Sequence, residues 1–146
     1  MSYAAGDLLT AGRTNRLQAK TYDATGTTNL ALTTTETDIA GASVTLTTET
    51  PGAIYVVRAD FSFDIASATT AFTSGVCQLD GVSLSGQARW SGEVGTDYGP
   101  ASHGWRGTIA AAGSHTFKLR GAISAGTGIT VLAAFTKLFV TIHEVV

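Results

Sequence analysis

Three histidines have the widest chemical scope in this sequence, because an imidazole acts as an acid, a base or a metal ligand near neutral pH. His103, His115 and His143 lie on separate segments, and no two of them have the spacing of a metal-binding helix. A zinc site would have to be assembled entirely by the fold. Two alternatives stay open for His143: copies from three subunits hold an ion on a symmetry axis, or it is an exposed or hydrogen-bonded strand residue.

The nucleophiles lack the neighbours that covalent catalysis requires. A serine or cysteine nucleophile needs a base that is oriented by an acid, and the chain contains no Gly-x-Ser-x-Gly segment. Cys77 is the single cysteine and stands between Val76 and Gln78, where a small buried side chain is expected. We therefore predict that the protein is not an enzyme and holds no cofactor.

Two groups of carboxylates are candidates for acid–base or calcium chemistry. Asp60 and Asp64 share the polar face of one expected strand, roughly 13 Å apart, which is too far for a glycosidase pair. We interpret them as solvated residues. Glu93, Asp97 and Tyr98 stand among glycines without the alternating oxygen ligands of an EF-hand, so a surface loop is favoured over a calcium site.

Trp90, Tyr98 and Trp105 bracket this acidic loop. They fit two interpretations: an aromatic platform for sugars, or burial in the core or between subunits. Since Trp90 and Trp105 fall within or at the end of expected strands, we favour burial.

Composition limits the classes of partner. The 146 residues carry a formal net charge of −2, and only 14 % of them are charged. The nine lysines and arginines are scattered rather than clustered, so we expect no nucleic-acid partner. No run of about 18 apolar residues and no signal-peptide pattern occur, so we expect no membrane partner and synthesis in the cytoplasm.

Short β-branched and aromatic runs separated by turn residues predict an all-β protein. The clearest strand is Ile54–Ile65, in which apolar residues from Tyr55 to Ile65 alternate with polar ones. Asp80-Gly81 predicts a hairpin between strands at Val76–Leu79 and Val82–Trp90. We expect a loop at Gly121–Gly128, followed by two strands or one bent strand to the C-terminus. The count is about eight strands, which fits an antiparallel jelly-roll sandwich or another Greek-key sandwich.

The first twenty residues combine leucines with basic residues and are too short for an independently stable helix. We interpret them as an extended arm that becomes ordered on a partner surface. Thr21–Thr37 is either an extended linker or an outer strand. The predicted organisation is an N-terminal arm and linker, 1–37, followed by a β-sandwich domain, 38–146.

The arm resembles the opening of small virion proteins of tailed phages, particularly those of actinobacteria. The resemblance is carried by residues 5–11 (AGDLLTA) and 15–18 (NRLQ), and continues in the segments 78–82 (QLDGV), 111–120 (AAGSHTFKLR) and 138–146 (LFVTIHEVV). It covers nearly the whole chain, although each motif alone also occurs in tail and fibre proteins.

The resemblance implies a jelly roll similar to the trimeric C1q and tumour-necrosis-factor (TNF) type, with three copies around a threefold axis. It also implies a bacteriophage structural protein, most simply a capsid decoration protein on the outer surface of the virion that binds and stabilises the head. The partners would be two further copies of itself and the major capsid protein. A minor tail or tail-tip protein and a carbohydrate-binding module are the alternatives. The residues expected to bind the particle are Leu8, Leu9, Arg13, Arg16 and Leu17.

Overall fold

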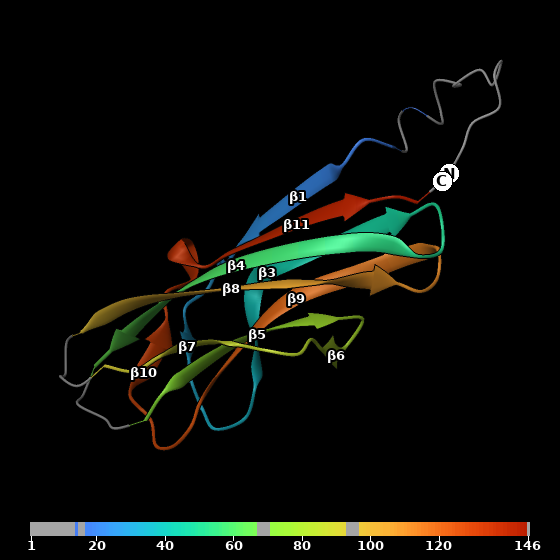
Figure 1. Cartoon of the computed structure of the whole chain (residues 1–146). Coiled ribbons are helices and arrows are strands. Elements are labelled where there is room, and N and C mark those ends of the chain that lie inside the picture. Colours follow the sequence, from blue (N-terminus) through green and yellow to red (C-terminus); the bar gives the residue numbers. More distant parts are fainter. Residues whose placement is uncertain (1–13, 15–16, 67–70, 93–96, 146) are drawn as a thin grey trace, which may run out of the picture.

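The computed structural model describes residues 14, 17–66, 71–92 and 97–145, which form two antiparallel β-sheets packed face to face (Figure 1). Sheet A has the order β1 (Lys20–Thr25), β11 (Lys137–His143), β4 (Ala53–Ile65), β10 (Ile129–Val131) and β2 (Leu30–Ala31), with β8 (Tyr98–Ile109) also paired to β4. Sheet B has the order β3 (Thr37–Thr48), β9 (Gly113–Ile123), β5 (Thr73–Leu79) and β6 (Val82–Ser83), with β7 (Ala88–Trp90) also paired to β5. One 3₁₀ turn, η1 (Ala133–Phe135), connects β10 to β11.

The predicted all-β jelly-roll class is confirmed, but the described residues contain eleven strands rather than about eight. The difference lies in short segments, since β2 and β6 have two residues each and β7 and β10 three. The prediction of one strand over Val82–Trp90 is wrong. Gly86 interrupts it with a φ of 95°, and its carbonyl oxygen accepts a hydrogen bond from Trp105 Nε1 at 3.2 Å.

Strand β4 shows the alternation that its sequence predicted. Its odd-numbered residues from Ala53 to Ile65 are all buried, and its even-numbered residues face outward. One edge of β4 pairs with β8 along its whole length, while β11 and then β10 share the other edge. β4 is therefore the central strand of sheet A, which fits its content of β-branched and aromatic residues.

The hydrophobic core fills the space between the two sheets. Phe61 and Phe63 on β4 and Phe117 and Leu119 on β9 are at most 1 % exposed. Tyr55 of β4 meets the Phe117 ring edge to face at 5.3 Å between ring centres, which joins the sheets directly. Burying each of these side chains contributes about 1.5–3 kcal/mol.

The Asp80-Gly81 hairpin is confirmed, since both residues have positive φ, 51° and 83°, as a tight two-residue turn requires. The Asp80 carboxylate also accepts a hydrogen bond from the backbone N–H of Thr116 at 2.7 Å and contacts His115 Nδ1 at 2.7 Å. These contacts attach the tip of the hairpin to β9.

The structure shows the secondary structure of three segments for which the sequence left alternatives open or predicted other bounds. Of the alternatives for Thr21–Thr37, the outer strand is found over Lys20–Thr25, because β1 pairs with β11. The loop predicted to begin at Gly121 begins later, since β9 continues to Ile123 and pairs there with β5. The C-terminal segment forms two strands, β10 and β11, separated by η1. The domain division at residue 37 stays a prediction, while β1 and β2 share a sheet with β4.

Gly75→Ala should lower the free energy of unfolding by about 1–3 kcal/mol, because a Cβ at this position would lie 2.5–2.6 Å from the Phe61 ring. The ring cannot move aside cheaply, since it is 1 % exposed and stacked on Phe63. Urea unfolding of Gly75→Ala, Phe61→Leu and the double variant provides the test. We expect Phe61→Leu to lower the free energy of unfolding by less in the Gly75→Ala background than in the wild type. Strictly additive losses of unfolding free energy would contradict the proposed clash.

Candidate functional site

The predicted particle-binding arm meets the described structure at Leu17, which is 49 % exposed. Leu8, Leu9, Arg13 and Arg16 lie outside the described residues. The chain enters sheet A at Lys20, which pairs with Ile142 near the end of β11. The two described ends of the chain thus lie at the same end of the sandwich (Figure 1). We call this region the base of the arm, defined by Lys20, Glu49, Thr50 and Glu144.

A buried carboxylate holds the base of the arm together. Glu144 is 7 % exposed and accepts hydrogen bonds from the backbone N–H groups of Glu49 and Thr50 at 2.9 and 3.1 Å and from the Thr50 hydroxyl at 2.7 Å. Burial acts to raise the pKa of Glu144, but these hydrogen bonds outweigh it and hold the pKa below its ordinary value. Lys20 Nζ lies 3.2 Å from Glu49 Oε1, so the first strand and the segment after the last strand are both fastened to the β3–β4 turn.

The outer face of sheet A carries an apolar group on β4 and β11, and β8, with Arg106 opposite Val56, lies between this group and an unpaired strand edge. Val56 is 41 % exposed, Ile54 and Phe139 are half-buried, and Thr141 lies opposite Val56 on β11. We call Ile54, Val56 and Phe139 the apolar patch. Among the described residues, β8 pairs with β4 alone, so its other edge presents unpaired backbone groups over a 12-residue strand. Such an edge is a template for association unless something covers it.

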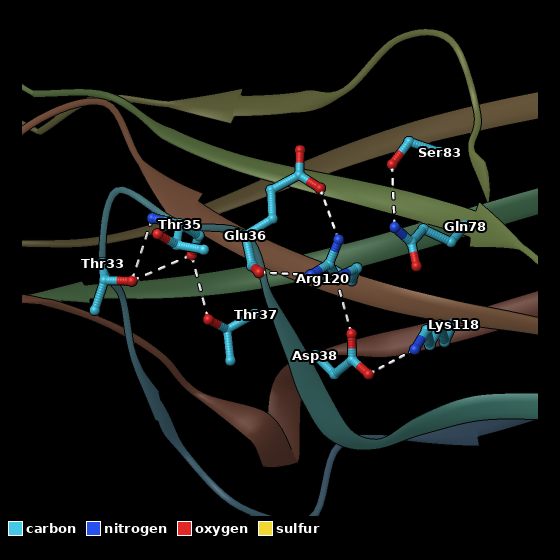
Figure 2. Close-up of polar contacts among 9 residues, drawn as sticks. All are labelled: Thr33, Thr35, Glu36, Thr37, Asp38, Gln78, Ser83, Lys118 and Arg120. Atoms are coloured by element: carbon cyan, nitrogen blue, oxygen red, sulfur yellow. Dashed lines mark hydrogen bonds and ion pairs between the residues drawn. The ribbon is translucent and has the colours of Figure 1, made fainter. Parts of the chain in front are cut away.

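The outer face of sheet B carries a network of ion pairs (Figure 2). Arg120 contacts Glu36 Oε2 through Nη1 at 3.1 Å and Asp38 Oδ1 through Nε at 2.8 Å, and Nη2 donates to the Glu36 carbonyl oxygen at 2.6 Å. Asp38 also accepts from Lys118 Nζ at 2.6 Å, a hydrogen bond that holds the pKa of Asp38 below its ordinary value. Charges that already pair with each other leave little need for a partner on this face.

The structure separates the side chains that the sequence offered for catalysis. Cys77 is fully buried, and burial raises the pKa of its thiol to about 12, so the expected small core residue is confirmed. The histidines lie apart: His103 packs against Trp105, His115 contacts Asp80, and His143 is exposed at the end of β11. Within the described ranges, no three His, Cys, Asp or Glu side chains form a group that could hold a metal ion.

His115 is the most confined of these histidines. Its Nε2 lies 3.0 Å from the carbonyl oxygen of Ala111 and its Nδ1 lies 2.7 Å from Asp80. Both neighbours are acceptors, so the ring is held between two oxygens that can each accept a hydrogen bond from it. Burial acts to raise the pKa of Asp80, but hydrogen bonds from His115 and Thr116 leave it below the ordinary value.

The acidic and aromatic residues considered for calcium, acid–base or sugar binding also lie apart from one another. Asp60 accepts hydrogen bonds from Ser102 at 2.6 Å and Arg58 at 3.2 Å on the outer face of sheet A, as expected of a surface residue. Glu93 lies outside the described residues. Trp105 is 4 % exposed and belongs to the core, which confirms burial for this residue, whereas Tyr98 is 66 % exposed. Trp90 is partly buried and stacks on Phe63 at 6.2 Å.

The two sheets form an antiparallel jelly roll, a fold that also occurs in solved structures of other proteins. Murine APRIL, in crystals at pH 8.0, has a TM-score of 0.52 at 10 % identity, covering 85 % of this chain and 98 % of that chain. The globular domain of zebrafish complement 1qA has a TM-score of 0.45 at 11 % identity, covering 86 % and 97 %. The VP2 subviral particle of infectious bursal disease virus has a TM-score of 0.48 at 10 % identity, covering 88 % of this chain and 38 % of that chain.

The similarity to APRIL shows the fold alone, because identity is only 10 %. No protein-family model and no curated protein matches the chain. No helix among the described residues has the length and apolar content needed to cross a membrane.

Sequence reasoning missed the apolar patch and the carboxylate of Glu144. A signal for the patch was present, since Ile54 and Val56 occupy positions of the polar face in an otherwise regular alternation. Glu144 carried no such signal, because its partners are 95 and 94 residues away in the sequence.

Glu144→Gln should lower the free energy of unfolding by about 1.5–3 kcal/mol at pH 7, because the charged acceptor of three hydrogen bonds is lost. The folded-state pKa of Glu144 is lowered, so its contribution is present above the ordinary value of 4.5 and is lost as the pH falls through the folded-state pKa. Urea unfolding at several pH values should therefore show the difference between the two proteins narrowing in acid. A difference that is independent of pH would contradict the ionic role.

Proposed function

We propose that the chain is a virion structural protein, a homotrimeric capsid decoration protein that binds and stabilises a phage head through its N-terminal arm. The outer face of sheet A is the observation that carries this proposal, because it presents exposed Val56 and, on the far side of the neighbouring strand, the unpaired edge of β8. The jelly-roll fold implied by the sequence resemblance is the fold observed, which supports the same conclusion.

Three copies around an axis would cover these features in each subunit. In a closed ring, the patch of one copy meets a different surface of the next, so the unpaired edge of β8 and the apolar patch can face each other between neighbouring copies. The ion pairs of sheet B then remain on the outside, where solvated charges belong. A single chain without a disulfide gains stability from this burial.

The arm supplies the contact with the particle. Residues 1–19 precede β1, so three arms in a trimer start from three copies of the base of the arm. After one arm binds, the other two are held at a high local concentration near their sites. Individually weak contacts of Leu8, Leu9, Arg13, Arg16 and Leu17 with the major capsid protein thus add up to stable attachment on the outer surface of the virion.

Val56→Arg should convert the trimer to monomers, because it places a charge in the centre of the proposed subunit contact. Light scattering should give three times the chain mass of 15.0 kDa for the wild type and 15.0 kDa for the variant. Thr47→Arg is the matched control, since Thr47 is exposed on the outer face of sheet B. Circular dichroism checks that both variants fold. A monomeric wild type, or a Val56→Arg protein that remains trimeric, would overturn the proposed assembly.

Removal of residues 1–19 should abolish binding to undecorated capsids while the trimer mass, reduced by the missing residues, persists. Sedimentation of capsids with the labelled protein measures the bound fraction. Leu17→Ser is a milder variant, with Val82→Ser as its control, because Val82 is 70 % exposed on β6 of sheet B, outside the arm. Unchanged capsid binding after removal of the arm would be incompatible with an arm-based attachment.

The alternative function is a minor tail or tail-tip protein, or a carbohydrate-binding module, that contacts the host surface. Binding to purified host cell walls without binding to capsids would favour it. Binding measured to undecorated capsids and to purified host cell walls therefore distinguishes the two functions.

A further inference from the structure

An open depression lies toward the end of the sandwich opposite the base of the arm. It has a volume of about 460 Å³ and is lined by Phe72, Arg89, Trp90 and Ser91. These residues come from β7 and from the segments that flank β5 and β7 in sheet B. In Figure 1, β7 and the start of β5 lie away from the ends of β1 and β11 that mark the base of the arm. The depression is thus separate from the base of the arm, while its residue Trp90 packs against Gly99 at the start of β8.

Arg89 is held in place by an aromatic ring and a side-chain amide. Its guanidinium carbon lies 4.1 Å from the centre of the Phe72 ring, a cation–π contact. When the Gln87 side-chain oxygen faces Arg89, it accepts from Nε at 2.5 Å and from Nη2 at 2.8 Å. No acidic side chain among the described residues pairs with Arg89, whereas both basic residues of the sheet B network, Lys118 and Arg120, do have acidic partners. Arg89 therefore offers an oriented positive charge to an external anion.

The walls of the depression are attached to regular strands. The Trp90 ring stacks on buried Phe63, and the Trp90 carbonyl oxygen accepts a hydrogen bond from Thr73 Oγ1 at 3.0 Å. The backbone N–H of Phe72 donates a hydrogen bond to the Ser124 hydroxyl at 3.0 Å. The carbonyl oxygen of Phe72 accepts one from the backbone N–H of Ser124 at 2.9 Å. A binding surface held in this way loses little conformational entropy when it takes a ligand.

The combination of groups selects a class of ligand. A guanidinium binds the oxygens of a carboxylate or phosphate through a fixed fork of N–H groups. Aromatic rings offer flat apolar surfaces that match the C–H face of a sugar ring, and a serine hydroxyl can exchange hydrogen bonds with sugar hydroxyls. A nucleic acid would also use an arginine and aromatic rings, but it requires a basic groove, and this chain has a formal net charge of −2.

We propose that the depression formed by Phe72, Arg89, Trp90 and Ser91 binds an acidic saccharide, a sugar unit that carries a carboxylate or phosphate group. Arg89 binds the anionic group, and the sugar ring lies in the depression beside Phe72, Trp90 and Ser91. The site differs from the aromatic platform predicted from the sequence, because Trp105 is buried and Phe72 and Arg89 take part instead. The proposal does not rest on trimer formation or on capsid binding.

The test is an NMR titration of the full-length protein labelled with ¹⁵N, following the indole N–H signal of Trp90. The probes are methyl glucuronide and glucose 6-phosphate, with methyl glucoside as the neutral sugar and inorganic phosphate as the anion without a sugar. We expect the two acidic sugars to shift the Trp90 signal and to bind about tenfold more tightly than either control probe.

Arg89→Gln should weaken binding of both acidic sugars about tenfold, and Arg89→Lys should restore part of it. Arg106→Gln, which changes an exposed arginine of β8, should leave binding unchanged. Equal binding of acidic and neutral sugars, or full binding by Arg89→Gln, would overturn the proposal. Inorganic phosphate binding as tightly as glucose 6-phosphate would reduce the depression to a simple anion site, and tighter binding of a single-stranded oligonucleotide would assign it to nucleic acid.

Discussion

Strand β4 is the element on which the rest of the structure depends, because both of its edges and its inner face are occupied. Its edges pair with β8 on one side and with β11 and β10 on the other. Its inner face places Tyr55, Phe61 and Phe63 against sheet B. A one-residue shift in register would turn these aromatic rings outward and expose the core, so the pairing of three other strands follows from the alternation of this one.

The outer faces of the two sheets differ in their side chains, and the proposed assembly rests on this difference. On sheet B, Glu36, Asp38, Lys118 and Arg120 neutralise one another across β3 and β9. On sheet A, the apolar patch lies among threonines, Arg58 and Arg106, and β8 lies between the patch and an edge with unpaired backbone groups. Ion pairs between exposed groups add little stability, but they keep a face hydrated, whereas an apolar patch and an open edge favour association.

The proposed functions occupy opposite ends of the sandwich. At one end, Glu144 fastens the β3–β4 turn to the segment after β11, and Lys20 adds the start of β1. At the other end, Arg89 and the neighbouring aromatic rings line an open depression. In a particle-bound trimer, the first end would face the shell and the second would face the medium. One small domain could then attach to a surface and present a second binding site away from it.

The sequence by itself determined the all-β class, the long central strand and the Asp80-Gly81 hairpin, since these depend on alternation and on residues that tolerate positive φ. It also indicated that Cys77 and Trp105 are buried. Only the tertiary structure decided that Lys20–Thr25 joins β11, that Glu144 accepts hydrogen bonds from the β3–β4 turn, and that Arg89 stacks on Phe72. The first two pair residues that are more than 90 positions apart in the sequence, and the third depends on how β7 packs beside β5. Local sequence patterns do not encode such contacts, because packing of the whole sandwich selects them.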